Sequence, residues 1–186
     1  MFIDLRGFTT LASRLAPRAL IDILREYQSI AVPVIHRHNG SITTYLGDGI
    51  MVTFGATRPS QTYCADALRC AQELLQVFEH WRVRRESAQQ PAPAVGLGVD
   101  TGTVTCGVIG EEGRLEYAVI GNPVNQAAKL QNHTKVEAVR GLSSAACLDC
   151  AHRQGYAPVA SQRALPARVV AGVSQPMDLI ALGQPQ

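Results

Sequence analysis

The sequence predicts an α+β fold, with helices packed against a mixed or antiparallel sheet. Two long segments carry apolar residues at helical spacing, one ending near residue 38 and one spanning about residues 59–84. Short β-rich runs lie between and after them, and some are close enough in sequence to pair as hairpins. At 186 residues the chain is most simply one domain, long enough to bury a hydrophobic core.

Composition and charge exclude several classes of protein. Hydrophobic residues make up 46% of the chain and charged residues 17%, which is typical of a globular protein and not of a disordered one. The formal net charge of +2 is too small to indicate a nucleic-acid or membrane-surface partner. No apolar run approaches the ~20 residues of a membrane span, and no signal-peptide pattern opens the chain. We therefore expect a cytoplasmic protein with no membrane segment and no nucleic-acid partner.

The first half of the chain is predicted as a strand, two helices, a hairpin and a third helix. The opening strand, Phe2–Leu5, is shorter than the about five residues of a usual core strand, which hints at an excerpt of a longer protein or a misplaced start codon. Thr9 and Thr10 are candidate caps for a short helix within residues 7–15. The other helices are predicted from Pro17 to about His38, ended by Asn39-Gly40, and from about Pro59 to Arg84.

The predicted hairpin joins strands at Ile42–Leu46 and Ile50–Phe54. Its turn is assigned to Asp48-Gly49, because Asp-Gly between two β-rich runs favours the positive φ that a tight turn needs. Asp48 alone is most simply a turn residue. A second aspartate, Asp4, lies in the opening strand just before a glycine turn that begins a helix. Two such acids can converge on divalent metals beside a helix N-terminus, which is the arrangement of two-metal phosphoryl chemistry.

The second half is predicted to continue the alternation after a polar surface loop at about residues 86–93. Asn122 is the expected cap of a helix that holds Pro123 in its first turn. The predicted elements are strands at 95–100, 103–108, 115–120 and 136–141, helices at 121–134 and 143–154, and closing strands at 168–170 and 177–182.

Five cysteines are scattered along a chain with no secretion signal, so reduced thiols are expected. Cys147 and Cys150 form a single Cys-x-x-Cys on a short predicted helix. Because no second pair accompanies them, we interpret them as packing residues, with a redox or zinc role as the alternative.

Four motifs follow one another along the chain. They are Phe2-Ile3-Asp4-Leu5-Arg6-Gly7-Phe8-Thr9; Leu46-Gly47-Asp48-Gly49 with Phe54-Gly55; Asp100-Thr101-Gly102 with Gly107-Val108-Ile109-Gly110; and Tyr117 to Leu130. In order and spacing they resemble the class III adenylate/guanylate cyclase catalytic domain. The resemblance extends to about Leu182, so the predicted domain is 1–183 with a tail at 184–186.

This resemblance implies a ferredoxin-like βαββαβ core with extra elements near the C-terminus, the nucleotide cyclase fold. It implies a reaction in which the ribose 3′-hydroxyl of a nucleoside triphosphate attacks its own α-phosphorus and expels pyrophosphate. By resemblance, two Mg²⁺ or Mn²⁺ ions are held by Asp4, Asp48 and the backbone carbonyl of Leu5. Backbone amides at the following helix start are expected to bind the phosphate oxygens, namely those of Gly7, Phe8 and Thr9.

Other functional positions of the family are only partly kept. The transition-state asparagine falls on Asn125, but the transition-state arginine falls on Lys129, which keeps the charge without the bidentate fork. The two base-recognition positions fall on Thr44, where the family has lysine, and on Ala118, which has no polar side chain. A triphosphate-binding lysine of the family falls on Ala171.

The favoured interpretation is an adenylate cyclase, with ATP preferred over GTP as the nucleoside triphosphate and with weak activity. Its support is Asp4, Asp48 and Asn125, because a site without a use would have no need of both acids. The family forms its active sites between two subunits, which implies a homodimer with shared active sites, or a heterodimer. The alternative is a degenerate cyclase-homology domain that serves as a regulatory or dimerisation partner. A diguanylate cyclase is disfavoured because the chain has no Gly-Gly-Asp/Glu-Glu-Phe hairpin.

Overall fold

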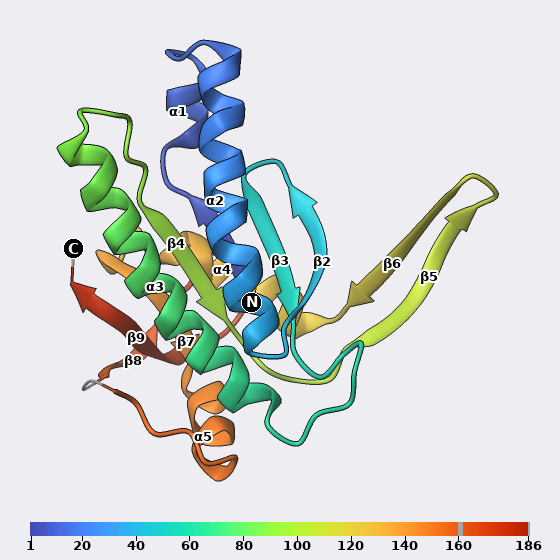
Figure 1. Cartoon of the computed structure of the whole chain (residues 1–186). Coiled ribbons are helices and arrows are strands. Elements are labelled where there is room, and N and C mark those ends of the chain that lie inside the picture. Colours follow the sequence, from blue (N-terminus) through green and yellow to red (C-terminus); the bar gives the residue numbers. More distant parts are fainter. Residues whose placement is uncertain (160–161, 186) are drawn as a thin grey trace.

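The computed structural model describes residues 1–159 and 162–185 and shows a seven-stranded sheet with helices on both faces (Figure 1). The strands lie in the order β2-β3-β1-β4-β7-β9-β8. The elements are β1 (Phe2–Leu5), α1 (Phe8–Ala12), α2 (Pro17–Arg37), β2 (Ser41–Leu46), β3 (Gly49–Thr53), α3 (Tyr63–Ser87), β4 (Val95–Val99), β5 (Thr105–Glu111), β6 (Arg114–Ile120), α4 (Asn122–His133), β7 (Val139–Ser144), α5 (Ala145–Arg153), β8 (Arg163–Arg168) and β9 (Met177–Pro185).

The first four sheet strands confirm the predicted ferredoxin-like core. Strand β1 lies between β3 and β4 and is antiparallel to both, and β2 pairs with β3 at the edge. Helix α2 connects β1 to β2, and α3 connects β3 to β4, which completes the βαββαβ order. The additional strands extend the sheet on the β4 side, where β7 is parallel to β4 and β9 is antiparallel to β7. The sheet is therefore mixed, within the predicted α+β class.

Helices cover both faces of the sheet. The main core joins α2, α3 and α5 to one face, with Leu97 of β4 and Trp81 of α3 among its fully buried members. A smaller core lies on the opposite face, where Leu130 of α4 packs with residues of β7, β8 and β9. Strand β9 serves both cores, because Ile180 joins the first and Leu179 the second.

Helix α4 lies directly on the backbone of β4. An added Cβ at Gly98 would lie 2.2 Å from the carbonyl oxygen of Ala127 and 2.3 Å from the amide nitrogen of Gln131. Both neighbours are backbone atoms of α4, so no side-chain rearrangement relieves the clash. The close approach of α4 to the sheet therefore depends on a residue without a side chain at position 98.

Strands β5 and β6 form a separate two-stranded hairpin that projects away from the body (Figure 1). Several of its apolar side chains lie in water, including Leu115, which is 69% exposed, and Val108, which is 64% exposed. An isolated two-stranded hairpin is marginally stable in water. Its exposed apolar surface is a feature that the predicted fold class did not include.

The structure corrects several predicted turns and caps. The turn between β2 and β3 is Gly47-Asp48, because Gly47 holds the positive φ of 65° and Gly49 already pairs with Leu46 in the sheet. Neither Thr9 nor Thr10 caps α1, since the N-cap is Gly7 with a φ of 71°. The Asn122 prediction is also wrong: it is the first residue of α4, and Gly121 is the cap.

Other corrections concern element bounds. Helix α3 begins at Tyr63, not near Pro59, and continues through Ser87, so the predicted loop at 86–93 starts two residues later. The last-but-one strand is β8 at Arg163–Arg168, not 168–170, because its partner β9 pairs with Arg163, Ala164 and Leu165. Strand β7 begins at Val139, after the turn that the prediction had included as strand.

Candidate active site

The structure brings Asp4 and Asp48 together at one end of β1 and β3. Strand β1 pairs with β3 in the register Ile3 opposite Ile50, which places Asp4 beside the turn that carries Asp48. Asp48 lies close enough to raise the pKa of the Asp4 carboxyl group. Ile3 belongs to the core beneath α2 and α3, so alternation along β1 directs Asp4 to the opposite face, the face on which α4 packs. The predicted convergence of the two acids is thus present in a single chain.

The surroundings of Asp4 disfavour its charged form. Partial burial, followed by the hydrogen bond and the negative charge of Asp48, raises the pKa of Asp4 to about 6. The positive charge of Lys135 and the backbone around Leu5 act in the opposite direction but do not cancel these effects. Two carboxyl groups held close together form a ready site for a cation, which relieves the repulsion between them.

The donor set at this pair fits a hard divalent cation. Across residues 1–159 and 162–185, no cluster of three or more His, Cys, Asp or Glu side chains is arranged to hold a metal. Further ligands would therefore come from backbone oxygens, water and substrate, as Mg²⁺ and Mn²⁺ prefer. Gly49 lies beside the pair, because a Cβ there would stand at an ordinary contact distance of 3.7 Å from Oδ1 of Asp4.

The segment after the first aspartate is held by backbone contacts on both sides. The amide of Arg6 donates to the carbonyl of Ala94 at 2.7 Å, and its guanidinium donates to the carbonyl of Val139. Gly7 then turns the chain in a left-handed conformation, and α1 begins at Phe8. The first amides of a helix have no intrahelical acceptor, so the predicted phosphate-binding segment of Gly7, Phe8 and Thr9 does lie at a helix start.

Asn125 and Lys129 lie one helical turn apart on α4. Asn125 is exposed, and Lys129 donates from its ammonium group to the carbonyl of Gly172. No hydrogen bond or ion pair in the described part of the chain joins either side chain to Asp4 or Asp48. Within the described residues of one chain, therefore, no hydrogen bond or ion pair links the predicted transition-state residues to the predicted metal ligands.

The remaining predicted positions lie at the surface. Thr44 is exposed on β2, and Ala118 is half-buried on β6, whose strand approaches β2. Ala171 is exposed next to Gly172, so the two positions that depart from the cationic residues of the family, Lys129 and Ala171, are neighbours in space. Lys129 supplies an ammonium group there, and Ala171 supplies no charge.

Sequence reasoning did not identify two residues near the aspartates. Lys135 follows α4, and its charge reaches Asp4. Tyr27 of α2 is fully buried, and its hydroxyl has no hydrogen-bond partner in the described residues. Burial, and then the charges of Asp4 and Asp48, raise the pKa of this phenol, which places it near the carboxylates. Helical spacing identified Tyr27 only as a core residue, because spacing does not show which residues of other elements lie near a side chain.

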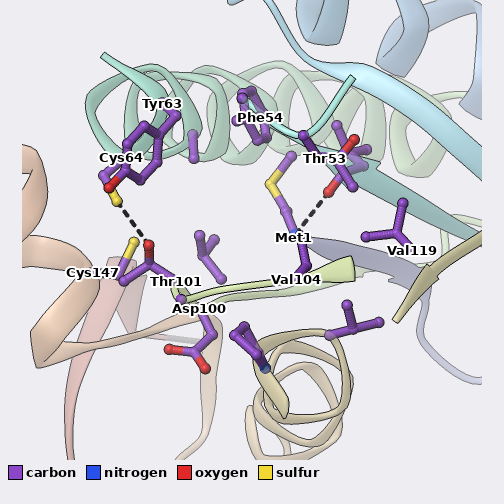
Figure 2. Close-up of a pocket in the computed structure, with 18 of the residues that line it drawn as sticks. Met1, Thr53, Phe54, Tyr63, Cys64, Asp100, Thr101, Val104, Val119 and Cys147 are labelled. Atoms are coloured by element: carbon purple, nitrogen blue, oxygen red, sulfur yellow. Dashed lines mark hydrogen bonds between the residues drawn. The ribbon is translucent and has the colours of Figure 1, made fainter. Parts of the chain in front are cut away.

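A cavity of about 360 Å³ lies away from the aspartates, at the opposite ends of β3 and β4 (Figure 2). Its walls include Phe54, Thr101 and Val119, together with Cys64 and Cys147, whose sulfur atoms face each other in Figure 2. The aspartate pair is thus an open site on the sheet, and the closed space belongs to a different part of the fold.

Comparison with known proteins identifies the family. The family model of the adenylate and guanylate cyclase catalytic domain matches residues 1–160. The chain therefore belongs to the adenylate and guanylate cyclase catalytic domain family. Adenylate cyclase 1 of Rhizobium meliloti is 27% identical over 165 residues, which cover 88% of this chain and 25% of that protein. The chain spans about a quarter of the length of the curated relatives it matches.

Solved structures agree with this assignment. The guanylyl cyclase Cya2 is similar with a TM-score of 0.82 and 26% identity, covering 100% of this chain and 90% of that one. The adenylyl cyclase CyaB from P. aeruginosa has a TM-score of 0.84 at 24% identity, covering 100% and 92%, and at that identity it supports the fold alone. No helix in the described residues combines the length and the apolar character needed to cross a membrane.

Proposed function

We propose that this chain is the catalytic domain of a nucleotidyl cyclase, and that its preferred reaction is the conversion of ATP to 3′,5′-cyclic AMP and pyrophosphate. The observation that carries the proposal is the pair of half-buried carboxyl groups, those of Asp4 and Asp48, at one end of β1 and β3. We also propose that the domain extends to residue 183, beyond the matched residues 1–160, because β9 supplies side chains to both cores.

Each group of residues has a separate task in this proposal. Asp4, Asp48 and the carbonyl of Leu5 hold two Mg²⁺ or Mn²⁺ ions, which when bound lower the pKa of the attacking hydroxyl and neutralise the triphosphate. The helix start at 7–9 orients the phosphate oxygens by donating backbone N–H groups. Asn125 and Lys129 stabilise the charge that develops in the transition state. The protein's contribution is positioning and charge neutralisation rather than covalent chemistry.

The proposal requires a dimer, preferably of two identical chains. No hydrogen bond or ion pair in the described residues joins Asn125 or Lys129 to the aspartates of their own chain. In this proposal a second copy completes the site, and each copy supplies the aspartates of one site and the α4 residues of the other. The β5–β6 hairpin supports this assembly, because it presents Val108 and Leu115 to solvent on an arm away from the body.

Because position 129 holds lysine and not arginine, we expect a low turnover number. An ammonium group is a point charge and cannot form the two parallel hydrogen bonds of a guanidinium group. Its present hydrogen bond to the carbonyl of Gly172 must also be given up before it reaches a substrate. Thr44 and Ala118 offer no cationic or carboxylate contact to a purine, so discrimination between ATP and GTP is expected to be weak.

The second candidate is a cyclase-homology domain with little activity that works as a regulatory partner or as half of a heterodimer. The observations that favour it are the absent cation at Ala171 and the engagement of Lys129 by a backbone carbonyl. Product formation separates the two proposals. The purified chain is assayed with ATP and with GTP, in Mn²⁺ and then in Mg²⁺, against Asp48→Ala.

Cyclic nucleotide from the chain, and none from Asp48→Ala, is the result that the active-enzyme proposal expects. Asp149→Ala is the matched control, because Asp149 is an exposed aspartate on α5 and should leave turnover unchanged. Product from Asp48→Ala at the level of the parent chain would remove Asp48 from the metal site. No product in any combination, from folded dimeric protein, would favour the regulatory domain.

A further inference from the structure

Three of the five cysteines meet where α3 contacts α5. Cys64 lies in the first turn of α3, whereas Cys147 and Cys150 lie on α5, so residues more than eighty positions apart in sequence share one small region. Cys70 and Cys106 lie elsewhere, on the middle of α3 and on β5. All five are free thiols in the structure. The sequence showed only the spacing of Cys147 and Cys150.

Cys64 and Cys147 form the inner pair of this cluster. Both are at most 2% exposed, both line the cavity at the ends of β3 and β4, and their side chains point toward one another (Figure 2). Cys64 also lies 3.2 Å from the hydroxyl oxygen of Thr101. The cavity gives a small molecule access to sulfur atoms that the surrounding protein otherwise covers.

Cys150 forms the outer member of the cluster. Its sulfur lies 3.5 Å from the hydroxyl of Tyr63, and the amide of Gln154 donates to it at 3.4 Å. The side-chain oxygen of Gln154 in turn accepts from the amides of Cys64 and Ala65. These contacts place Cys150 beside Tyr63 and close to Cys64 as well, so Cys147 and Cys150 both lie near the Cys64 thiol, and of these two only Cys147 lines the cavity.

The chemistry of the pair is asymmetric. Proximity to Cys64 lowers the pKa of Cys147, whereas proximity to Cys147 and burial raise the pKa of Cys64, whose thiol donates to the hydroxyl oxygen of Thr101. Cys147 also lies in the first turn of α5, where the helix dipole favours an anion, and its amide donates to the hydroxyl of Ser144 at 3.2 Å. Cys147 is therefore the better nucleophile, and Cys64 is the adjacent thiol that can resolve its oxidised form.

We infer that Cys64 and Cys147 are a redox-active pair that forms a reversible disulfide between α3 and α5 when a hydroperoxide enters the adjoining cavity. The Cys147 thiolate attacks the terminal peroxide oxygen, the O–O bond breaks, and a sulfenic acid and water are formed after proton uptake. Cys64 then attacks the sulfenic sulfur, the S–S bond forms, and the hydroxyl leaves as water with the Cys64 proton. Two thiols are oxidised by two electrons and hydrogen peroxide is reduced to two waters. A dithiol reverses the step by exchange.

A structural metal is disfavoured as the purpose of the cluster. The three thiols do not form a metal-holding group in the described residues. The pair is also remote from Asp4 and Asp48, because β3 separates Asp48 from the Phe54 end of the cavity by the length of a five-residue strand, about 17 Å. The inference therefore does not depend on the proposed cyclase activity.

Peptide mapping tests the pair directly. The full chain is treated with hydrogen peroxide, remaining thiols are alkylated under denaturing conditions, and the protein is cut with trypsin and with a protease that cleaves before aspartate. Because Asp149 lies between the two α5 cysteines, Cys147 is recovered in residues 141–148 and Cys150 in residues 149–153, whereas Cys64 is recovered in residues 48–65. The expected product is a cross-link between 48–65 and 141–148 that dithiothreitol removes.

Matched variants make the assignment specific. Cys147→Ala should lose the cross-link, whereas Cys70→Ala, which changes another buried cysteine of α3, should keep it, as should Cys150→Ala. Circular dichroism before treatment shows whether each variant is folded, and the wild-type map alone remains decisive if Cys147→Ala is not. A predominant cross-link between 48–65 and 149–153, or oxidation of Cys64 and Cys147 to sulfinic acids without any cross-link, would overturn the inference.

Discussion

The metal-free protein should be destabilised by its own two aspartates. The pKa of Asp4 is raised from 3.8 to about 6, first by partial burial and then by Asp48. A carboxyl group with a higher pKa in the folded than in the unfolded chain binds its proton more tightly when folded. Its contribution to stability is therefore full below about pH 4, falls as the pH rises to about 6, and stays lost above that. Removing the charge of Asp48 should restore part of that stability.

The size of the effect follows from the contributions to the shift. A pKa change from 3.8 to about 6 corresponds to about 3 kcal/mol of unfolding free energy at most. Burial is the largest cause and remains in Asp48→Asn, and water screens the interaction because Asp4 is only half-buried. We therefore expect Asp48→Asn to stabilise the metal-free protein by about 1 kcal/mol near pH 8, which raises Tm by about 2–4 °C for a domain of this size.

Thermal unfolding in EDTA measures this directly. The gain in Tm of Asp48→Asn over wild type should be present near pH 8 and should vanish near pH 4, where Asp4 is protonated in both proteins. Excess Mn²⁺ should reverse the order, because only the wild type retains both ligands and is stabilised by binding. Asp149→Asn, an exposed change, should alter neither Tm. A gain that persists near pH 4, or no gain near pH 8, would refute the explanation by repulsion between carboxylates.

Three further variants test other parts of the structure. Lys129→Arg should raise kcat with a smaller change in KM, because a bidentate contact acts in the transition state, and an unchanged kcat would remove Lys129 from that role. Gly98→Ala should lower Tm by roughly 6–12 °C, because the added methyl group overpacks against α4 at a cost of about 3 kcal/mol. Gly107→Ala is the control and should leave Tm unchanged, because a Cβ at Gly107 would have nothing within 4 Å. Equal Tm values for the two variants would contradict the close contact at Gly98. Leu115→Arg on the β5–β6 hairpin should shift the protein toward monomer in light scattering and gel filtration. Val136→Arg is the control, because Val136 is about as exposed as Leu115 but lies outside the hairpin. If both variants remain dimeric, the interface does not include the hairpin.

The sequence was sufficient to predict those features of the fold that depend on residues close together in the chain. The helical stripe of α2, the Pro-led start of α4 and the turn between two β-rich runs were all predicted at nearly their observed places. The turn was off by one residue, because Gly47 and Gly49 flank Asp48 and either can supply positive φ. Only the pairing of Leu46 with Gly49 decides between them, and that pairing is a property of the sheet.

Features that depend on distant segments were beyond the sequence. The cluster of Cys64 with Cys147 requires the contact of α3 with α5, and the sequence gives no sign of which helices touch. The projection of β5 and β6 out of the main sheet was also not predicted, because their alternation resembles that of any hairpin. The position of Asn125 relative to the aspartates is likewise a tertiary property, and the lack of a hydrogen bond between them in the described residues supports the proposed second chain.

The energetics of the aspartate pair bear on the choice between an enzyme and a regulatory domain. Folding does not need Asp4 or Asp48: each could be uncharged without loss of a core contact, and together they weaken the metal-free fold above about pH 6. Residues that cost stability and occur together at one point of a fold are expected where they bind something. Thr44 and Ala118, by contrast, carry no charge, so under the proposed assignment their departure from the family pattern would affect base selection and leave both aspartates in place. The energetics of the aspartate pair therefore favour the proposed enzyme over the proposed regulatory domain.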